Sequence, residues 1–462
     1  MFSLIKIFVS ALICMLSTTI LYAEEANPDL VSAHGVFVFN TLLFLIGGFL
    51  VMWMAAGFAM LEAGLVRSKN VTTQLTKNIA LFSIAAIAYF LVGFNLMYPG
   101  DLVEGSWLIS GYLGPIFSLT SLEPVGAAVD QIGDISYASV GSDFFFQLMF
   151  CATTASIVSG TIAERMKLWP FLIFTVLLTA FLYPIEASWQ WGGGWLSELG
   201  FSDFAGSTLV HAAGASAALA GAIVLGPRIG KYKDDGSVNP MPGSNMPLAT
   251  LGTFILWLGW FGFNGGSQLA WGGDDSVYAS AVVMVTQIAA AAGGLGALIT
   301  SWLWFGKPSL SQTLNGCIAG LVSITAGCGN MTAGGAVMAG LIGGIIVVFS
   351  IELIEKKLKV DDAIGAVSVH GVCGFWGTIV IGLWGVDGAD GIGLFNGGGG
   401  AQFVAQLIGA VAYMVWAMVM SFIVFAALKY TLGLRVTEEE EVGGLDLSEH
   451  GQIAYPGKRA RE

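Results

Sequence analysis

The sequence predicts an all-α integral membrane protein with eleven transmembrane helices, arranged as two inverted five-helix repeats plus a C-terminal span. Three observations predict this fold: apolar segments longer than about 18 residues, basic residues confined to alternate loops, and a motif that occurs twice. Of the 462 residues, 55% are hydrophobic and only 11% are charged, and no hydrophilic stretch is long enough to form a soluble domain. The net charge of −13 argues against nucleic acid as a partner.

Residues 1–23 have the features of a signal peptide. Lys6 provides a short positive region, an apolar segment follows, and Ala23 closes a small-residue cleavage site before Glu24. We expect cleavage to leave the mature N-terminus outside. The alternative is that this segment is retained as a membrane helix.

The mature chain divides into a membrane domain over residues 24–430 and a tail over residues 431–462. The membrane domain contains a series of apolar segments of membrane-spanning length, of which the eighth is short. The predicted spans are about 37–63, 74–98, 141–163, 168–186, 206–226, 247–268, 277–303, 312–326, 332–354, 364–386 and 401–429.

The lysines and arginines predict the orientation. After the signal peptide they all fall in or beside alternate loops or in the tail, and the opposite loops contain none, namely 99–140, 187–205, 269–276, 327–331 and 387–400. By the positive-inside rule the N-terminus lies outside and the C-terminus in the cytoplasm, which requires an odd number of spans. We therefore expect a multi-pass protein of the cell inner (plasma) membrane.

The motif D-x-x-G-x-x-x-V-H occurs from Asp203 to His211 and again from Asp362 to His370. An Asp at a helix start accepts hydrogen bonds from the free first-turn N–H groups, and the His then lies ~12 Å inside the helix, near the membrane midplane. An ionisable side chain at that depth is costly and typically marks a transport pathway. The alternative interpretation is two unrelated core histidines, each hydrogen-bonded to a backbone carbonyl.

The predicted orientation gives the repeated motif its meaning. Asp203 begins span five from the outer side, whereas Asp362 begins span ten from the cytoplasmic side. Spans one to five and six to ten then form an inverted repeat, which would make His211 and His370 neighbours able to share or relay a proton. The other ionisable residues of the spans lie near span ends, namely Glu62, Glu164, Glu186, Glu352 and Glu355. The pairs Gly316/Gly320 and Gly340/Gly344 form small-residue helix faces, and the close packing that they allow implies a narrow route.

Aromatic side chains gather at the outer ends of three predicted spans. The segments are WQWGGGW with Trp189, Trp191 and Trp195, FFFQLMF from Phe144 to Phe150, and GWFGFNGGS from Trp260 to Ser267. Aromatic faces attract a cation, and the Ser267 hydroxyl could accept a hydrogen bond from it. From composition alone, an interfacial aromatic belt with ordinary core phenylalanines is the favoured interpretation.

These segments together resemble the Amt/Mep/Rh family of ammonium transporters, on the bacterial Amt side. The similar stretches cover nearly all of the mature chain in order: EAGLVRSKN, FQLMF, TIAERMK, WGGGW, DFAGSTLVH, GWFGFNGGS, DDAIGAVSVHGVCG and GLRVTEEEEVGGLDLSEHGQIAY. One position departs from the family pattern, because many members carry Asp where this chain has Gly365. That residue corresponds to Gly206 of the first motif, and we expect small effects at the cytoplasmic exit.

The resemblance implies a homotrimer embedded in membrane lipid, in which each protomer carries a narrow hydrophobic pore for ammonium or ammonia and for methylammonium. It implies cation capture at the outer side, deprotonation and passage past a twin-His pair, without a cofactor or an enzymatic reaction. The implied outer cation site consists of Trp191, Phe150, Ser267 and Phe146, with Asp203 nearby in a mainly structural and electrostatic role. The implied gate and pore residues are Phe150, Phe263, Trp260, His211 and His370.

The tail segment TEEEEVGGLDLSEHGQIAY resembles that of family members gated by PII signalling proteins. As a bare sequence it is typical of a solvated acidic terminus. The cysteines form no CxxC pair, and their spacing with the two predicted buried histidines fits no metal site, so we predict neither a disulfide nor a metal.

Two other functions remain open from the sequence. One is an ammonium sensor of the same fold, which a fused signalling domain would indicate. The other is an inverted-repeat secondary transporter for a larger solute, which a broad cavity with discontinuous helices would indicate.

Overall fold

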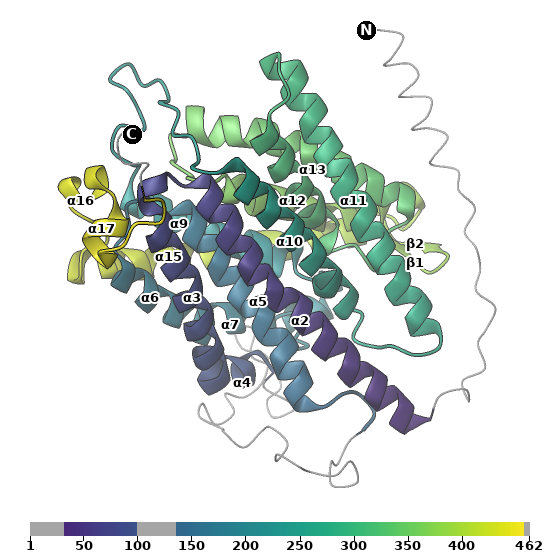
Figure 1. Cartoon of the computed structure of the whole chain (residues 1–462). Helices are drawn as coiled ribbons and strands as arrows, with labels where there is room; N and C mark the ends of the chain where they lie inside the picture. Colours follow the sequence, from purple (N-terminus) through teal and green to yellow (C-terminus); the bar gives the residue numbers. More distant parts are fainter. Residues whose placement is uncertain (1–31, 99–134, 457–462) are drawn as a thin grey trace.

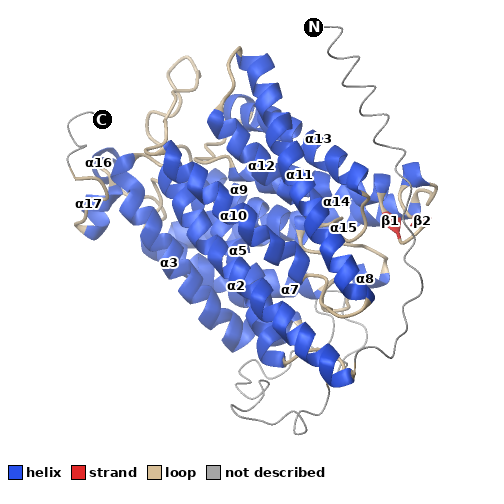
Figure 2. Ribbon diagram, turned by 45° about the vertical axis from the view of Figure 1, so that its right-hand side comes forward, coloured by secondary structure: helices blue, strands red, loops and turns tan. Residues whose placement is uncertain are grey.

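The structure of the protein is a computed structural model that describes residues 32–98 and 135–456. The predicted signal peptide, most of loop 99–140 and residues 457–462 lie outside this part. The described chain is a bundle of long helices (Figure 1). The strands β1 (Val386–Asp387) and β2 (Asp390–Gly391) form one small antiparallel hairpin. Figure 2 places this hairpin on the side of the bundle opposite α16 and α17, as Figure 1 does.

The helices of the first half follow the predicted spans closely. Several contain a π-helical turn, so one span is made of consecutive segments. The order is α2 (Ala33–Leu65), η2 (Ser68–Asn70), α3 (Val71–Ala88), η3 (Tyr89–Gly93), α4 (Phe94–Met97), α5 (Val140–Thr161), α6 (Leu168–Leu177), η5 (Leu178–Leu182), α7 (Tyr183–Ser188), α8 (Trp195–Glu198), η6 (Ser207–Ala212) and α9 (Ala213–Leu225).

The second half continues in the same way and ends in two short helices of the tail. The order is α10 (Met246–Gly266), α11 (Asp274–Phe305), α12 (Leu310–Thr325), α13 (Ala333–Glu352), η7 (Leu353–Lys357), η8 (Val367–Val372), α14 (Cys373–Trp384), η9 (Leu394–Asn396), α15 (Ala401–Thr431), α16 (Glu438–Gly443) and α17 (Leu445–His450).

Among the described residues, ten helices are long and apolar enough to cross a membrane. They overlap ten of the predicted spans, which confirms a multi-pass helical membrane protein. The predicted eighth span, 312–326, corresponds to α12, whose 16 residues make it shorter than the others.

Small residues let the central helices pack backbone to backbone, as the glycine pattern predicted. A Cβ atom added at Gly344 would lie 2.0 Å from the carbonyl oxygen of Gly293, and one at Gly340 would lie 2.1 Å from that of Ala289. Added at Gly320, it would lie 2.3 Å from the Ala289 carbonyl oxygen. The glycine faces of α12 and α13 therefore pack on the same two turns of α11, and any side chain there would separate the helices.

The basic residues of the predicted cytoplasmic loops form a buried ion-pair network. The Arg228 guanidinium contacts Glu164 Oε1 at 3.0 Å and Asp361 Oδ1 at 2.8 Å, and Arg67 also pairs with Glu164. Burial alone would raise the pKa of Asp361, but hydrogen bonds and charge from Arg228 outweigh it and hold that pKa well below its usual range. The pKa of Glu164 is likewise lowered, because Arg228 and Arg67 outweigh its burial.

The tail packs against these loops instead of extending into solvent. Asp446 accepts a hydrogen bond from the backbone N–H of Thr73 at 2.9 Å, and Asn70 accepts one from the N–H of Leu445 at 2.9 Å. Glu441 pairs with Arg435 and accepts the Ile229 N–H at 2.7 Å. A wholly solvated acidic terminus is therefore the wrong description of this segment.

Candidate functional site

The two D-x-x-G-x-x-x-V-H motifs start their helices as predicted. The Asp203 carboxylate accepts four backbone N–H groups, from Gly206, Ser207, Thr208 and Leu209, at 2.8 to 3.0 Å. Asp362 accepts the N–H of Val367 at 2.7 Å and the hydroxyl of Thr161 at 3.0 Å. Each Asp thus satisfies first-turn donors that the helix itself leaves without partners.

Both motifs also need their glycine. Gly206 has φ +103° and Gly365 has φ +83°, a left-handed conformation that a side chain disfavours. Gly206 directly precedes η6 and Gly365 lies two residues before η8, and each of these turns carries a His. Gly365 therefore repeats the backbone geometry of Gly206, which accounts for the local symmetry seen in the sequence.

The two histidines meet in the interior of the bundle. Their Nδ1 atoms lie 3.3 Å apart, and their ring centroids lie 5.2 Å apart at an angle of 25°. His211 is 0% exposed and His370 is 5% exposed. The predicted neighbours are therefore in contact, and this contact between rings replaces the alternative of two separate histidines on backbone carbonyls.

Close approach of the two His-bearing segments makes this contact possible. A Cβ atom at Gly374 of α14 would lie 2.4 Å from the carbonyl oxygen of Ser207, and the hydroxyls of Thr208 and Thr378 are in contact. The two segments therefore cross with almost no side chain between their backbones.

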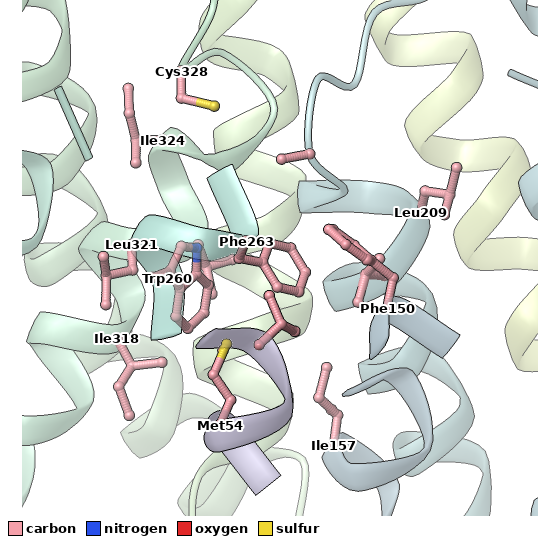
Figure 3. Close-up of a cluster of buried hydrophobic side chains, with 14 of the residues drawn as sticks. Met54, Phe150, Ile157, Leu209, Trp260, Phe263, Ile318, Leu321, Ile324 and Cys328 are labelled. Atoms are coloured by element: carbon pink, nitrogen blue, oxygen red, sulfur yellow. The ribbon is translucent and has the colours of Figure 1, made fainter. Parts of the chain in front are cut away.

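Aromatic rings continue from the His pair toward the loops that are predicted to lie outside. The His211 ring stacks on Trp260 at 4.9 Å and on Phe263 at 5.3 Å. Phe263 contacts Phe150 at 4.2 Å between centroids, at an interplanar angle of 39°. Figure 3 shows Phe150 and Phe263 facing each other, with Trp260 beside Phe263 on the same helix.

The end of this row away from the His pair is formed by the residues predicted to capture a cation. Phe150 meets Trp191 edge to face at 5.5 Å and Phe146 at 4.8 Å. The indole N–H of Trp191 donates to the backbone carbonyl of Asp203 at 2.9 Å, which fixes the ring. Asp203 therefore positions Trp191 through its backbone carbonyl, while its carboxylate accepts hydrogen bonds from backbone N–H groups.

Ser267 lies at the end of α10, one turn beyond Phe263. Its hydroxyl donates to the Phe263 carbonyl at 2.7 Å, so its lone pairs stay able to accept a hydrogen bond. Trp260 donates its indole N–H to the Thr325 hydroxyl at 2.8 Å, which holds the ring against His211. All nine predicted site residues thus belong to one connected region, although their roles stay predictions.

Sequence reasoning missed one side of this region. A small cavity beside His370 is lined by Glu62, Asn315 and Ile364 as well as by apolar residues. Glu62 lies near the end of its predicted span, where a carboxylate is ordinary, and Asn315 has no charge to mark it in the sequence. The sequence signal was weak: a carboxylate within the final turn of a long apolar segment is common where a span meets a loop.

This arrangement defines a class of protein. A multi-pass helical bundle with a buried row of aromatic rings that ends on paired imidazoles is a membrane transporter with a narrow route. The sequence profile of the Ammonium Transporter Family matches residues 42–455, so the chain belongs to that family.

Individual relatives agree with this assignment. The chain is 40% identical to the ammonium transporter Amt2 of Archaeoglobus fulgidus, over 98% of this chain and 95% of that protein. It is 38% identical to a putative ammonium transporter of Synechocystis, over 98% and 96%. Among solved structures, a protein titled Sensor Amt Protein matches with TM-score 0.80 and 37% identity, covering 90% of this chain and 98% of that one. Candida albicans Mep2 matches with TM-score 0.77 and 29% identity, covering 89% of each chain.

Proposed function

We propose that the protein transports ammonium or ammonia, and methylammonium, across the membrane through the row of rings from Trp191 to His370. The single observation that carries this proposal is the unbroken series of ring contacts among Trp191, Phe150, Phe263, His211 and His370. Family membership and the names of the relatives support ammonium as the substrate. These names favour transport over the sensor alternative.

Capture occurs at the outer end. Trp191, Phe150 and Phe146 offer aromatic faces and edges around one position, and Ser267 offers a hydroxyl oxygen. Cation–π attraction contributes on the order of 1 to 2 kcal/mol where the site is partly desolvated. A small cation that donates hydrogen bonds satisfies both kinds of partner.

Selection occurs at the two phenylalanines and the His pair. Phe150 and Phe263 are about 1% and 0% exposed and contact each other, so a hydrated ion cannot pass between them without separating the rings. Potassium resembles ammonium in size and charge but cannot give up a proton. Ammonium deprotonates near Phe150 and crosses as ammonia, while the proton passes by way of the His pair.

The remaining expectations form part of the same proposal. With α12 counted as the short eighth span, the chain has eleven spans, an outer N-terminus and a cytoplasmic C-terminus in the inner membrane. Two inverted five-helix repeats then relate the motifs of Asp203 and Asp362. The protein forms a trimer, and a PII-type regulator contacts the tail.

Reconstitution tests the proposal directly. We expect proteoliposomes that contain the protein to take up labelled methylammonium faster than empty liposomes, with ammonium competing and potassium not competing. Current recorded on the same membranes shows whether the proton crosses with the ammonia. Uptake equal to that of empty liposomes, from protein shown to be folded and trimeric, would contradict the proposal.

A further inference from the structure

The cavity beside His370 gives the site an inner end that the proposed function leaves unassigned. Its polar wall residues are Glu62 from α2, Asn315 from α12 and His370 from η8, and the other lining residues are apolar. The space in which the centre of a water-sized molecule can move is about 10 Å³, which is room for about one such molecule. Ammonia and ammonium are of this size.

The Glu62 carboxylate is held in a fixed position, and its two oxygens differ. Oε2 accepts the side-chain amides of Gln74 at 2.5 Å and Asn78 at 2.6 Å. Oε1 has the Ser159 hydroxyl at 2.8 Å, and that same hydroxyl lies 3.0 Å from Oε2. A hydroxyl has one hydrogen to give, so Oε1 keeps acceptor capacity that no described residue fills.

The less occupied oxygen also lies near a second residue of the cavity wall. A Cβ atom added at Gly160 would lie 3.0 Å from Glu62 Oε1 and 2.2 Å from Ile364 Cδ1. Ile364 and Glu62 both line the cavity, so Oε1 and this lining side chain lie close to the same point beside Gly160. A side chain at position 160 would clash with Ile364 and crowd the carboxylate.

The charged and titratable groups that face Glu62 are few. From α3, Lys77 interacts electrostatically with Glu62, while across the cavity the facing group is His370. The polar side chains that the described parts of α5 and α12 place there, Ser159 and Asn315, are uncharged. The Lys77 ammonium is 0% exposed, makes no hydrogen bond within the described part of the chain, and lies 5.7 Å from the Phe171 ring centroid. Lys77 is therefore a nearby counter-charge without a direct ion pair to fix Glu62 in one protonation state.

We propose that Glu62 is the inner proton-exchange group and cation site of the pore, an inference that rests on the proposed function. Ammonia that has passed the His pair takes the proton of the neutral Glu62 carboxyl: an N–H bond forms, the O–H bond breaks, and ammonium is left beside the carboxylate. The carboxylate then regains a proton from the His370 side, which returns the proton released at the outer site. One ammonium thus leaves for each that entered.

Glu62→Gln tests this role because it keeps the side chain's size and an oxygen to accept the Gln74 and Asn78 amides. We expect the ammonium current to fall by about tenfold to 100-fold, at or below what a positioned proton-transferring group contributes. We also expect the dependence of current on internal pH to flatten, and the concentration for half-maximal current on the outer side to stay unchanged. Ser159→Ala is the matched control, because it removes a hydrogen bond at the same carboxylate but leaves the carboxylate in place, and should keep the pH profile.

A purely structural Glu62, which only ties α2 to α3 and α5, gives a different result. Glu62→Gln with wild-type current and pH profile would overturn the proposal, and so would a reduced current whose pH profile is unaltered. Should Glu62→Gln fail to reach the membrane, Glu62→Asp replaces it: slower current with the pH dependence retained supports the proposal, and loss of that dependence contradicts it. Wild-type liposomes are assayed in parallel. Absence of ammonium current in the wild type would contradict the proposed function, whereas wild-type current together with an unaffected Glu62→Gln variant would contradict only the role of Glu62.

Discussion

At the scale of single residues, Phe150 joins the two parts of the candidate site. Its ring contacts Trp191 and Phe146 on one side and Phe263, toward the His pair, on the other. A cation held by the first group, as proposed, would lie one ring away from the Phe150–Phe263 contact. This placement separates binding at the outer end from passage further in, so that variants can affect one without the other.

Trp191→Leu should weaken capture without closing the route. Loss of cation–π attraction of about 1 kcal/mol should raise the half-saturating ammonium concentration about fivefold, with little change at saturation. The measurement is current against ammonium concentration in proteoliposomes. Trp195→Leu is the control, because Trp195 packs on Trp189 and, unlike Trp191, forms no ring contact with Phe150 among the described residues. An equal loss at every concentration for Trp191→Leu would argue against a binding role.

His211→Ala and His370→Ala should each either block transport or admit potassium. Removal of one imidazole leaves the Nδ1 of the other without its partner, at a cost of about 1–3 kcal/mol unless water enters. Water in that space would let a hydrated cation cross, and His→Asp or Glu should favour the cation form. Ammonium and potassium currents distinguish these outcomes, with His34→Ala, at the exposed start of α2, as the control. Wild-type flux and selectivity in both alanine variants would make the histidines packing residues.

At the scale of elements, ion pairs connect the loops that lie beside the spans. Arg228 of the segment after α9 bridges Glu164, beyond α5, to Asp361, before η8. Three segments distant in sequence thus share one buried guanidinium. Breaking one side of such a buried pair leaves a charge without its partner, which typically costs about 3–5 kcal/mol.

Asp361→Asn should destabilise the detergent-solubilised protein and change its response to acid. Because the folded pKa of Asp361 is depressed, its contribution is present above the unfolded pKa of about 4 and is lost as pH falls below it. Wild-type thermal midpoints should therefore stay level from about pH 7 to 5 and drop below about 4. The variant should begin lower and drop less. A variant that melts like the wild type across this range would show that the ion pair contributes nothing.

The sequence predicted the elements better than the contacts between them. Span positions could be predicted because apolar length is a local property, and the Asp caps because a cap and its helix are adjacent. The same lysines and arginines that predicted sidedness gave no indication that Arg228 pairs with Asp361, since partner choice depends on how loops fold together. Glu62 was missed for the same reason: the cavity exists only once α2, α5 and α12 surround His370.

At the scale of the whole molecule, helix α17 near the C-terminus meets two segments that are distant in sequence. Asn70, near the start of the chain's second long helix, accepts the Leu445 N–H, and Glu449 accepts the Leu168 N–H at 3.3 Å. Figure 1 shows α16 and α17 against one edge of the bundle. A partner that binds the tail therefore contacts a structure already connected to the loops beside the route.

Deletion of the residues after Arg435 should remove binding of a PII-type protein and leave the protein trimeric in the membrane. The motivation is a charged segment outside every predicted span, joined to the loops by hydrogen bonds such as those of Asp446 and Glu441. Pull-down with purified PII and gel filtration in detergent measure the two properties. A full-length Glu439→Gln variant, changed at an exposed position of α16, serves as control and should retain both. Truncated protein that still retains PII would refute this assignment.

The contact between the two Nδ1 atoms makes the His pair directional. If both rings are neutral, the Nδ1 contact is a hydrogen bond only when one Nδ1 carries a hydrogen and the other does not. Two mirror states therefore exist: the donor is His211 in one and His370 in the other. A proton that enters at one ring and leaves at the other converts the first state into the second. The pair is then reversed, and its rings must turn or exchange their hydrogens with water before another proton can follow. In the proposed relay each proton passage therefore requires a reset of the pair, and the rate of that reset would set an upper limit on turnover however fast ammonia itself moves.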